Sequence, residues 1–322
     1  MENKKLIAIG EALIDFIPDK TGCAFGDVTG FSPKVGGAPA NVCGAFSKLG
    51  GGSMIITQLG KDPFGMKIAE ELSESGIDTS AIRFTDEANT ALAFVSLAKD
   101  GNRTFSFYRK PSADMLLSPE QLDENWFKDA YALHFCSVSL GDYPMKDAHI
   151  KAVEIARKNR MLISFDPNLR FQLWNDTEKL CQRVNEFIPI CDVLKISDEE
   201  LEFITGESDI KKAIPALLDK GVKLIVYTCG KNGAYAYTRS TEAFSPSVKV
   251  KVVDTTGAGD GFIGSFLWKL QSLGMSADNI GRTDENTLRE CLDFSNRFCA
   301  LSVQSHGAIS SYPSINQVQK TI

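Results

Sequence analysis

The chain has 322 residues, 43% of them hydrophobic, which is enough to bury the core of one large α/β domain spanning residues 1–322. Its 35 basic and 41 acidic residues give a net charge of -6 without a concentrated basic stripe, so a small-molecule partner is favoured over a nucleic acid. The eight cysteines fall singly and no apolar run is long enough to cross a membrane; we therefore expect reduced thiols, no membrane association and a cytoplasmic location.

Short apolar segments alternate along the chain with longer amphipathic ones. The short segments predict buried strands at residues 6–9, 54–57, 132–135, 161–165, 192–196 and 223–228. Among the long segments, Phe64, Ile68 and Leu72 recur at helical spacing before Gly76, a natural helix stop. This alternation predicts a doubly wound, mostly parallel sheet between layers of helices.

Two regions break the alternation, at residues 11–36 and 86–110. Within the second region, two strand-like runs flank the turn at residues 99–102 and predict a β-hairpin. A few strands of this kind would make a small β lid able to keep water from a reaction. An ordinary extension of the sheet edge explains the pattern equally well.

The most informative segment is residues 248–262. Alternation over residues 248–253 predicts a strand, which leads through a glycine-rich turn into a helix. The small residues Gly257, Ala258 and Gly259 let backbone N–H groups converge at the helix start, where a phosphate or a developing anion is favoured. Asp260 at the same start is able to act as a general base. Alternatively, the glycines only form a tight turn and Asp260 only caps the helix.

A dinucleotide-binding site is an alternative interpretation of the same turn. Gly259, Gly261 and Gly264 fit G-x-G-x-x-G, but that fold needs a second strand ending in an acidic residue, and residues 274–287 look like a polar loop. The sequence also lacks the G-x-x-x-x-G-K-[ST] of a P-loop and the G-x-S-x-G of a serine hydrolase. The sequence therefore argues against a dehydrogenase, a P-loop enzyme and a serine hydrolase.

Two motifs in the expected order resemble the ribokinase-like carbohydrate kinase family and, within it, the fructokinases. They are V-G-G-A-P-A-N-V at residues 35–42 and D-T-T-G-A-G-D at residues 254–260, and the resemblance extends over nearly the whole chain. It implies a three-layer α/β/α ribokinase-like fold with a mostly parallel central sheet and a small β lid. It also implies ATP as phosphoryl donor, with Mg²⁺.

The resemblance assigns one group of residues to the sugar and the reaction. The expected sugar contacts are Asp15, Gly36, Gly37, Asn41, Phe107, Arg109 and Asp260. Asp260 is the expected base, the turn Gly257–Ala258–Gly259 is the anion hole, and Arg170, after the strand at 161–165, would clamp the phosphoryl group or the sugar.

A second group is assigned to the nucleotide. Its members are Lys195, Glu200, Thr228, Gly230, Gly233, Gly257, Ala258, Gly259 and Asn296. Glu200 corresponds to the glutamate of an N-x-x-E motif that organises Mg²⁺ through water, although Ser197 replaces the asparagine. Ser197 and Glu200 also read as a helix capping box.

The resemblance further implies a potassium ion beside the anion hole. The positions that map onto its ligands are Asp254, Thr256, Ser302, Ser305, Gly307 and Ser311, several of them through backbone carbonyls. As an alternative, Asp254 initiates a turn.

These expectations add up to an ATP-dependent sugar kinase, with the conversion of D-fructose to fructose 6-phosphate as the first choice. Another small sugar such as 2-keto-3-deoxygluconate or a ribosyl compound stays open, and so does a sugar- or nucleotide-binding regulator without catalysis. An exposed lid edge would also allow a homodimer.

Overall fold

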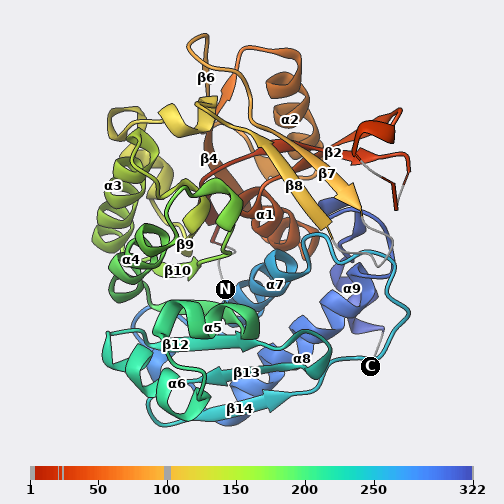
Figure 1. Ribbon diagram of the computed structural model, residues 1–322. Coiled ribbons are helices and arrows are strands. Elements are labelled where there is room, and N and C mark those ends of the chain that lie inside the picture. Colours follow the sequence, from red (N-terminus) through yellow and green to blue (C-terminus); the bar gives the residue numbers. More distant parts are fainter. Residues whose placement is uncertain (1–3, 21, 24, 98–102, 321–322) are drawn as a thin grey trace.

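The computed structural model describes residues 4–20, 22–23, 25–97 and 103–320, and Figure 1 shows its elements. Within these residues the main sheet has ten strands in the order β14-β13-β12-β11-β10-β9-β1-β4-β5, with β6 also paired to β4. Neighbouring strands pair in parallel except for β12 with β13 and β13 with β14, which pair antiparallel. Their bounds are β1 (Leu6–Ile9), β4 (Ser53–Gly60), β5 (Ile77–Asp78), β6 (Ile82–Thr85), β9 (Ala132–Cys136), β10 (Leu162–Asp166), β11 (Val193–Ser197), β12 (Leu224–Thr228), β13 (Ala234–Tyr237) and β14 (Glu242–Ser245).

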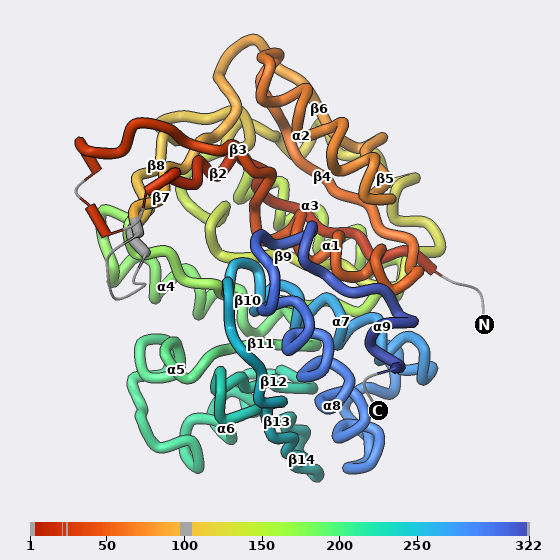
Figure 2. Tube along the Cα trace, turned by 90° about the vertical axis from the view of Figure 1, so that its right-hand side faces the viewer, coloured from red at the N-terminus to blue at the C-terminus, as the bar shows by residue number. Residues whose placement is uncertain are grey.

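Helices cover both faces of this sheet. They are α1 (Ala38–Lys48), α2 (Pro63–Glu74), α3 (Pro144–Lys158), α4 (Thr177–Phe187), α5 (Asp198–Thr205), α6 (Ile210–Asp219), α7 (Ala258–Ser272), α8 (Glu285–Ser302) and α9 (Ile315–Gln319). In Figure 2, α5 and α6 lie on one side of β11 to β13, and α7 and α8 lie on the other. The expected three-layer α/β/α architecture is confirmed.

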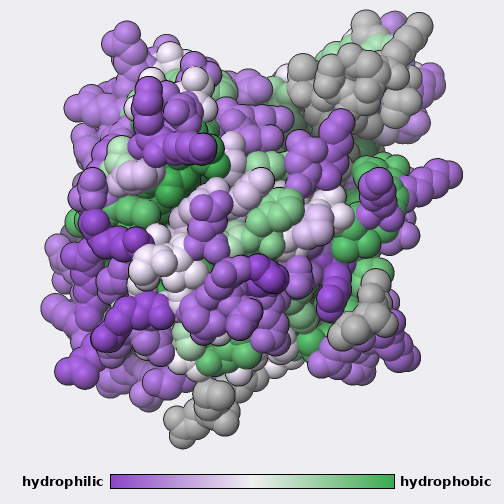
Figure 3. Space-filling model, turned by 90° about the horizontal axis from the view of Figure 1, so that it is seen from below, coloured by the Kyte–Doolittle hydropathy of each residue, from purple (hydrophilic) through white to green (hydrophobic). Residues whose placement is uncertain are grey.

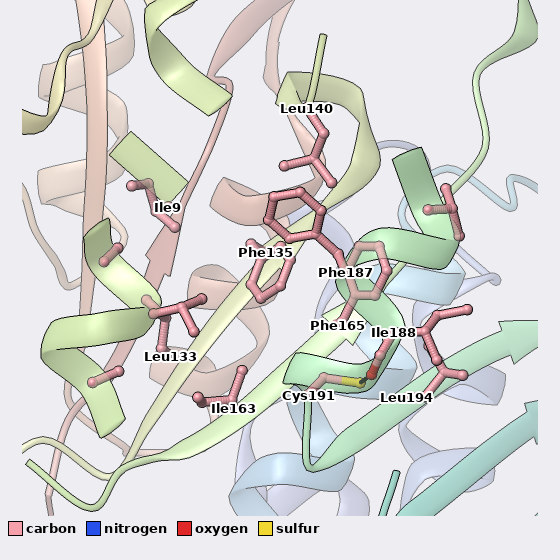
Figure 4. Close-up of a cluster of buried hydrophobic side chains, with 14 of the residues drawn as sticks. Ile9, Leu133, Phe135, Leu140, Ile163, Phe165, Phe187, Ile188, Cys191 and Leu194 are labelled. Atoms are coloured by element: carbon pink, nitrogen blue, oxygen red, sulfur yellow. Dashed lines mark hydrogen bonds between the residues drawn. The ribbon is translucent and has the colours of Figure 1, made fainter. Parts of the chain in front are cut away.

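The central strands are mainly hydrophobic because each face packs against helices. Side chains alternate between the faces: Ile7 and Ile9 of β1 join the cluster beneath α3 and α4, whereas Leu6 joins the cluster beneath α1 and α7. In the first cluster the rings of Phe135 and Phe165, on β9 and β10, stack at 4.8 Å, as Figure 4 shows. All six predicted buried strands are present, with ends shifted by a few residues.

Glycine allows α1 and α7 to cross closely. A Cβ atom at Gly264 of α7 would come within 2.8 Å of both Ala45 Cβ and the Val42 carbonyl of α1. This contact brings together the helices that carry Asn41 and Asp260, which are more than two hundred positions apart in the sequence.

The two regions that break the α/β pattern form a separate four-stranded sheet. Its order is β3 (Phe31–Gly36), β2 (Leu13–Pro18), β7 (Leu92–Leu97) and β8 (Arg103–Tyr108). Strands β7 and β8 pair antiparallel, so the predicted hairpin is confirmed, although its turn at 99–102 lies outside the described residues. The sheet projects from one side of the body (Figure 2) and forms the small β lid expected from the resemblance.

One expected strand is wrong. Residues 246–255 have no regular secondary structure, and the strand before the glycine-rich turn is β14, which ends at Ser245. The alternating valines attract a strand prediction, but Val252 is 57% exposed and Val253 is 45% exposed. The amide of Val253 bonds the carbonyl of Val303 at the end of α8, so this segment is an extended crossover rather than a strand of the sheet.

The surface seen in Figure 3 is mainly hydrophilic, with hydrophobic groups confined to smaller areas. None of the helices in the described part of the chain combines the length and apolar character needed to cross a bilayer.

Candidate active site

The glycine-rich turn ends at the N-terminus of α7. Gly257 adopts a left-handed conformation, φ 71°, and no side chain caps the helix there. A Cβ at Gly257 would lie 2.6 Å from Ala308 Cβ and 2.7 Å from the Tyr312 hydroxyl, so glycine is required. The Ala258 amide bonds the Thr255 carbonyl, which makes Gly259 and Asp260 the first-turn donors best placed for an anion.

The carboxylate of Asp260 is held between two amide side chains. Oδ2 accepts a hydrogen bond of 2.9 Å from Nδ2 of Asn41, and Oδ1 accepts one of 3.3 Å from Nδ2 of Asn168. Burial raises the pKa of Asp260, and the Asn41 hydrogen bond and the charges of Arg170 and Lys195 only partly oppose this effect. A carboxylate with a raised pKa is a better proton acceptor than an exposed aspartate.

A cavity of about 210 Å³ opens above Asp260 and beneath the lid. Its lining includes the following predicted site residues: Asp15, Gly37, Asn41, Phe107, Arg170, Thr256, Gly257 and Asp260. The predicted sugar contacts in this set and the predicted base therefore lie around one cavity. Oδ1 of Asn41 is buried with no hydrogen-bond partner among the described residues, so an acceptor is available to a ligand there.

Gly36 and Gly37 make room for the acidic groups of this cavity. A Cβ at Gly36 would lie 2.3 Å from Oδ2 of Asp15, and one at Gly37 would lie 2.5 Å from the Glu11 carbonyl. Gly36 itself does not line the cavity; it lets the Asp15 carboxylate take its position. Gly37 does line it, with φ 109°, which a residue with a side chain rarely adopts.

Arg109 lies elsewhere than expected. It does not line the cavity but is buried at the base of the lid, paired with Asp114 and donating to the Val138 carbonyl at 3.1 Å. Burial alone would lower the pKa of Arg109, but Asp114 outweighs it and the pKa rises. A buried guanidinium with its donors satisfied in this way positions other groups and is poorly suited to direct contact with the sugar.

Lys195 and Glu200 lie beneath the anion hole. Nζ of Lys195 is 2.9 Å from Asp166 and would be 3.3 Å from a Cβ placed on Gly259. Burial opposes the charge of Lys195, but Asp166, Glu200 and Asp260 outweigh it and raise its pKa. A cation is therefore held directly under the turn.

The capping box predicted at Ser197 and Glu200 is present. Oε2 of Glu200 accepts from the backbone and hydroxyl of Ser197, and Oε1 accepts from the Leu169 amide at 2.8 Å. Burial alone would raise the pKa of Glu200, but Lys195 and these hydrogen bonds lower it, so the carboxylate stays ionised. An ionised carboxylate fits a role beside metal-bound water.

The other predicted nucleotide residues lie at or after the end of β12 and within α8. Thr228 ends β12, and Gly230 follows it with φ 49°. Gly233 serves packing, because a Cβ there would lie 2.2 Å from the Ser245 carbonyl. Asn296 donates to Ser245 Oγ at 2.8 Å, so its Nδ2 fastens the end of β14, and an adenine contact stays a prediction.

Most residues of the predicted cation site also come together. Oδ1 of Asp254 accepts from the backbone and hydroxyl of Thr256, and Oδ2 accepts from the Gly307 amide at 3.0 Å. The hydroxyls of Ser302 and Ser311 lie 2.8 Å apart, while the side chain of Ser305 is exposed. Asp254 thus initiates a turn, as the alternative reading held, and that turn gathers oxygen atoms next to α7.

The sequence reading missed two functional residues, Asn168 and Glu11. Asn168 follows a buried strand in D-P-N-L-R and has φ 45°, a conformation that asparagine tolerates better than most residues. Glu11 lines the cavity with 3% exposure. Their position in the sequence could have identified them. Both follow buried strands whose carboxyl ends meet at one edge of the sheet, where ligand sites of this fold class gather.

Comparisons with known proteins agree with this geometry. The model of the family described as pfkB family carbohydrate kinase matches residues 3–315. A probable fructokinase-5 of Arabidopsis thaliana is 40% identical over 98% of this chain and 96% of its own, and fructokinase-2 of Solanum lycopersicum is 40% identical over 97% and 94%. A crystal structure of fructokinase with bound ATP from Xylella fastidiosa superimposes with a TM-score of 0.90 at 32% identity, covering 99% of this chain and 98% of that one. With a matching fold, a matching family model and full-length relatives, the chain belongs to the pfkB family of carbohydrate kinases.

Proposed function

We propose that this kinase is an ATP-dependent fructokinase, which transfers the γ-phosphoryl group of ATP to the 6-hydroxyl of D-fructose. The observation that carries the proposal is the Asp260 carboxylate, buried at the start of α7 and facing the cavity that Asp15 and Asn41 also line. Relatives and solved structures named fructokinase support fructose as the sugar.

In this mechanism Asp260 accepts the proton of the sugar hydroxyl as the hydroxyl oxygen forms a bond to the γ-phosphorus. The bond between that phosphorus and the β–γ bridging oxygen breaks, and ADP leaves with the electron pair. The amides of Gly259 and Asp260, with Arg170 and Lys195, offset the charge on the phosphoryl oxygens. Asp15 and Asn41 orient the sugar, and the lid limits the access of water.

Mg²⁺, with Glu200 holding a water of its shell, would neutralise part of the phosphate charge when bound. We also propose a potassium ion among Asp254, Thr256, Ser302, Ser305, Gly307 and Ser311. One structural neighbour, a fructokinase from Vibrio cholerae, is titled as bound to fructose, ADP and potassium ion, and has a TM-score of 0.88 at 31% identity over 99% of this chain and 98% of that one. Carboxylate and hydroxyl oxygens such as those of Asp254 and Thr256 suit a hard cation.

The charges around the cavity favour a neutral sugar over a sugar acid. Glu11, Asp15 and Asp260 line it, and Arg170 is the one cation among the described lining residues. Arg109, which would recognise a sugar carboxylate, is paired with Asp114 instead. The volume of about 210 Å³ is small beside the roughly 300–1,000 Å³ of typical ligand sites and suits a monosaccharide better than a riboside with a base.

We further propose a homodimer through the lid, whose outer strands β3 and β8 are edges of the four-stranded sheet. Tyr108 at the end of β8 is 63% exposed.

The cysteines, all free thiols, suit a reducing compartment such as the cytosol.

A panel of sugars assayed with ATP and Mg²⁺, with and without K⁺, tests the proposed function. We expect the highest kcat/KM with D-fructose, a product phosphorylated at the 6-position by NMR, and a kcat lowered roughly a thousandfold in Asp260→Asn. A marked preference for 2-keto-3-deoxygluconate or a riboside would overturn the choice of substrate. Saturable sugar binding in calorimetry without ADP release from any sugar would instead indicate a regulator.

A further inference from the structure

A chain of buried polar groups runs from the base of the lid to the first turn of α1. One terminal nitrogen of Arg109 donates to Oγ of Ser139 at 3.1 Å. That hydroxyl donates to Oε2 of Glu11 at 3.2 Å, and Oε1 of Glu11 accepts from the Ala38 amide at 3.2 Å. Both neighbours therefore donate to Glu11: the Ser139 hydroxyl, itself bound by Arg109, donates to one carboxylate oxygen, and the Ala38 amide donates to the other.

Glu11 supplies the cap that α1 lacks. The N-cap residue of α1 is Gly37, which has no side chain and is needed at this close approach to the Glu11 carbonyl. Ala38 is the first helical residue, and its amide would otherwise have no partner within the helix. The carboxylate of Glu11 bonds this amide and also lies where the partial positive charge of the helix end is strongest.

The first turn of α1 in turn sets the position of the proposed catalytic group. The amide of Asn41 bonds the Gly37 carbonyl at 2.9 Å, so the Asn41 backbone follows the turn that Glu11 caps. The side chain of Asn41 donates to Asp260 and lines the sugar cavity. A displacement of this turn would thus move one of the two amides that orient the base.

Arg109, at the other end of this chain of polar groups, is held by several hydrogen bonds. Nε of Arg109 donates to Asp114 at 3.0 Å, and a terminal nitrogen donates to the Val138 carbonyl at 3.1 Å. Arg109 and Asp114 are both almost fully buried. Arg109 directly follows β8, the last strand of the lid, so the orientation of Glu11 is tied to the place where the lid joins the body.

We infer that Glu11 is a positioning residue for phosphoryl transfer, which fixes the first turn of α1 and through Asn41 the catalytic carboxylate, while Ser139 and Arg109 fix Glu11. This inference rests on the proposed function. It assigns Glu11 no proton transfer and no direct bond to the sugar; its effect passes through α1.

Four variants of the full-length chain test this inference: Glu11→Gln, Ser139→Ala, the double variant, and Ser53→Ala as control. Ser53 is also a buried serine with a hydrogen-bonded hydroxyl, but it lies at the opposite end of β4 from the active site and bonds the Cys43 carbonyl of α1, beyond the first turn that Glu11 caps. Glu11→Gln preserves shape and an acceptor for Ala38, and Ser139→Ala cuts the chain one step further back. KM for fructose, KM for ATP, kcat and melting temperature are measured for each.

We expect Glu11→Gln to lower kcat/KM for fructose about tenfold, by lowering kcat and raising KM for fructose, because Asn41 both orients Asp260 and lines the sugar cavity. KM for ATP should stay unchanged. Ser139→Ala acts through Glu11, so the double variant should be no worse than Glu11→Gln alone, and Ser53→Ala should match the wild type. A purely structural role would lower the melting temperature and leave both KM values unchanged.

Two results would overturn the inference. One is a folded Glu11→Gln or Ser139→Ala variant whose kcat/KM for fructose stays within about twofold of the wild type. The other is a double variant whose loss equals the product of the two single losses, since independent effects multiply. If the wild type does not phosphorylate fructose, the proposed function fails instead, and the same ratios are measured with the sugar that it phosphorylates best.

Discussion

Nδ2 of Asn41 donates a hydrogen bond of 2.9 Å to Oδ2 of Asp260, joining two motifs separated by 219 positions in the sequence. The contact forms because α1 and α7 cross closely at Gly264. It places the proposed base on the floor of the sugar cavity, and Asn168 holds its second oxygen. The orientation of Asp260 therefore depends on α1, on α7 and on the segment after β10 that carries Asn168.

Asp260→Asn should lower kcat roughly a thousandfold, because an amide cannot accept the proton of the sugar hydroxyl. Binding of fructose and of ATP should change little, since the side chain keeps its size. ADP release measures turnover, and calorimetry measures binding. Asp284→Asn, which changes an exposed helix cap, serves as the matched control. Near-normal turnover by purified, folded Asp260→Asn would exclude Asp260 as the base.

Two substitutions of Asn168 distinguish the effect of its side chain from the effect of its backbone conformation. Asn168→Ala and Asn168→Gly both remove the amide that donates to Asp260, so both should lower kcat roughly tenfold. Only alanine should also strain the backbone at φ 45°, at about 1 kcal/mol, so the glycine variant should be the more stable of the two in urea unfolding. A wild-type kcat in the glycine variant would show that this hydrogen bond does not orient the base.

The alternation of short and long apolar segments was enough to predict the fold. Strands such as Leu6–Ile9 are buried on both faces, so every side chain in them carries the signal. The strand predicted at residues 248–253 is absent because β propensity reflects only the side chains. A strand also needs a free sheet edge with which to pair. Pro246 follows β14 directly, and Val253 bonds α8 instead of another strand.

The site was predictable where a motif and the chemistry coincide, as at Gly257 and Asp260. Positions that depend on distant partners were not. Arg109 appeared free to meet the sugar, and only the fold shows that Asp114 and Val138 occupy its donors. Glu11 appeared to be an ordinary residue after a strand, and its role depends on Ala38, which local sequence does not reveal.

Asp254→Asn should reduce activation by K⁺, because it removes the negative charge from the turn that gathers Thr256 and Gly307. The ratio of kcat with K⁺ to kcat with tetramethylammonium, at constant ionic strength, should fall toward one. Ser305→Ala is the control, since it keeps the backbone carbonyl of a predicted ligand and removes only an exposed hydroxyl. An unchanged ratio in Asp254→Asn would remove this residue from the proposed cation site.

The buried pair of Lys195 and Asp166 should give a strong double-mutant coupling. Lys195→Met leaves Asp166 without its cation in a buried site, which should lower the free energy of unfolding by about 3–5 kcal/mol. Adding Asp166→Asn should recover much of that loss, because no unpaired charge remains. KM for ATP should stay raised in both, since the charge under Gly259 is gone. Recovery of stability together with a normal KM for ATP would limit Lys195 to a structural role.

The stability that Glu11 confers should depend on pH in a defined direction. Burial, opposed by Arg109, raises the pKa of Glu11 to about 7 in the folded chain, from 4.5 as an exposed group. Between these values the folded state binds more protons than the unfolded state, so the contribution is full below about pH 4.5 and is lost as pH rises through about 7. Other carboxylates titrate as well, so the useful quantity is the difference in the free energy of unfolding between the wild type and Glu11→Gln, which cannot ionise there. Urea unfolding at pH 5 to 8 should show this difference falling by at most about 3 kcal/mol in favour of the variant. A difference that stays constant or rises with pH would show that Glu11 is already ionised well below neutrality.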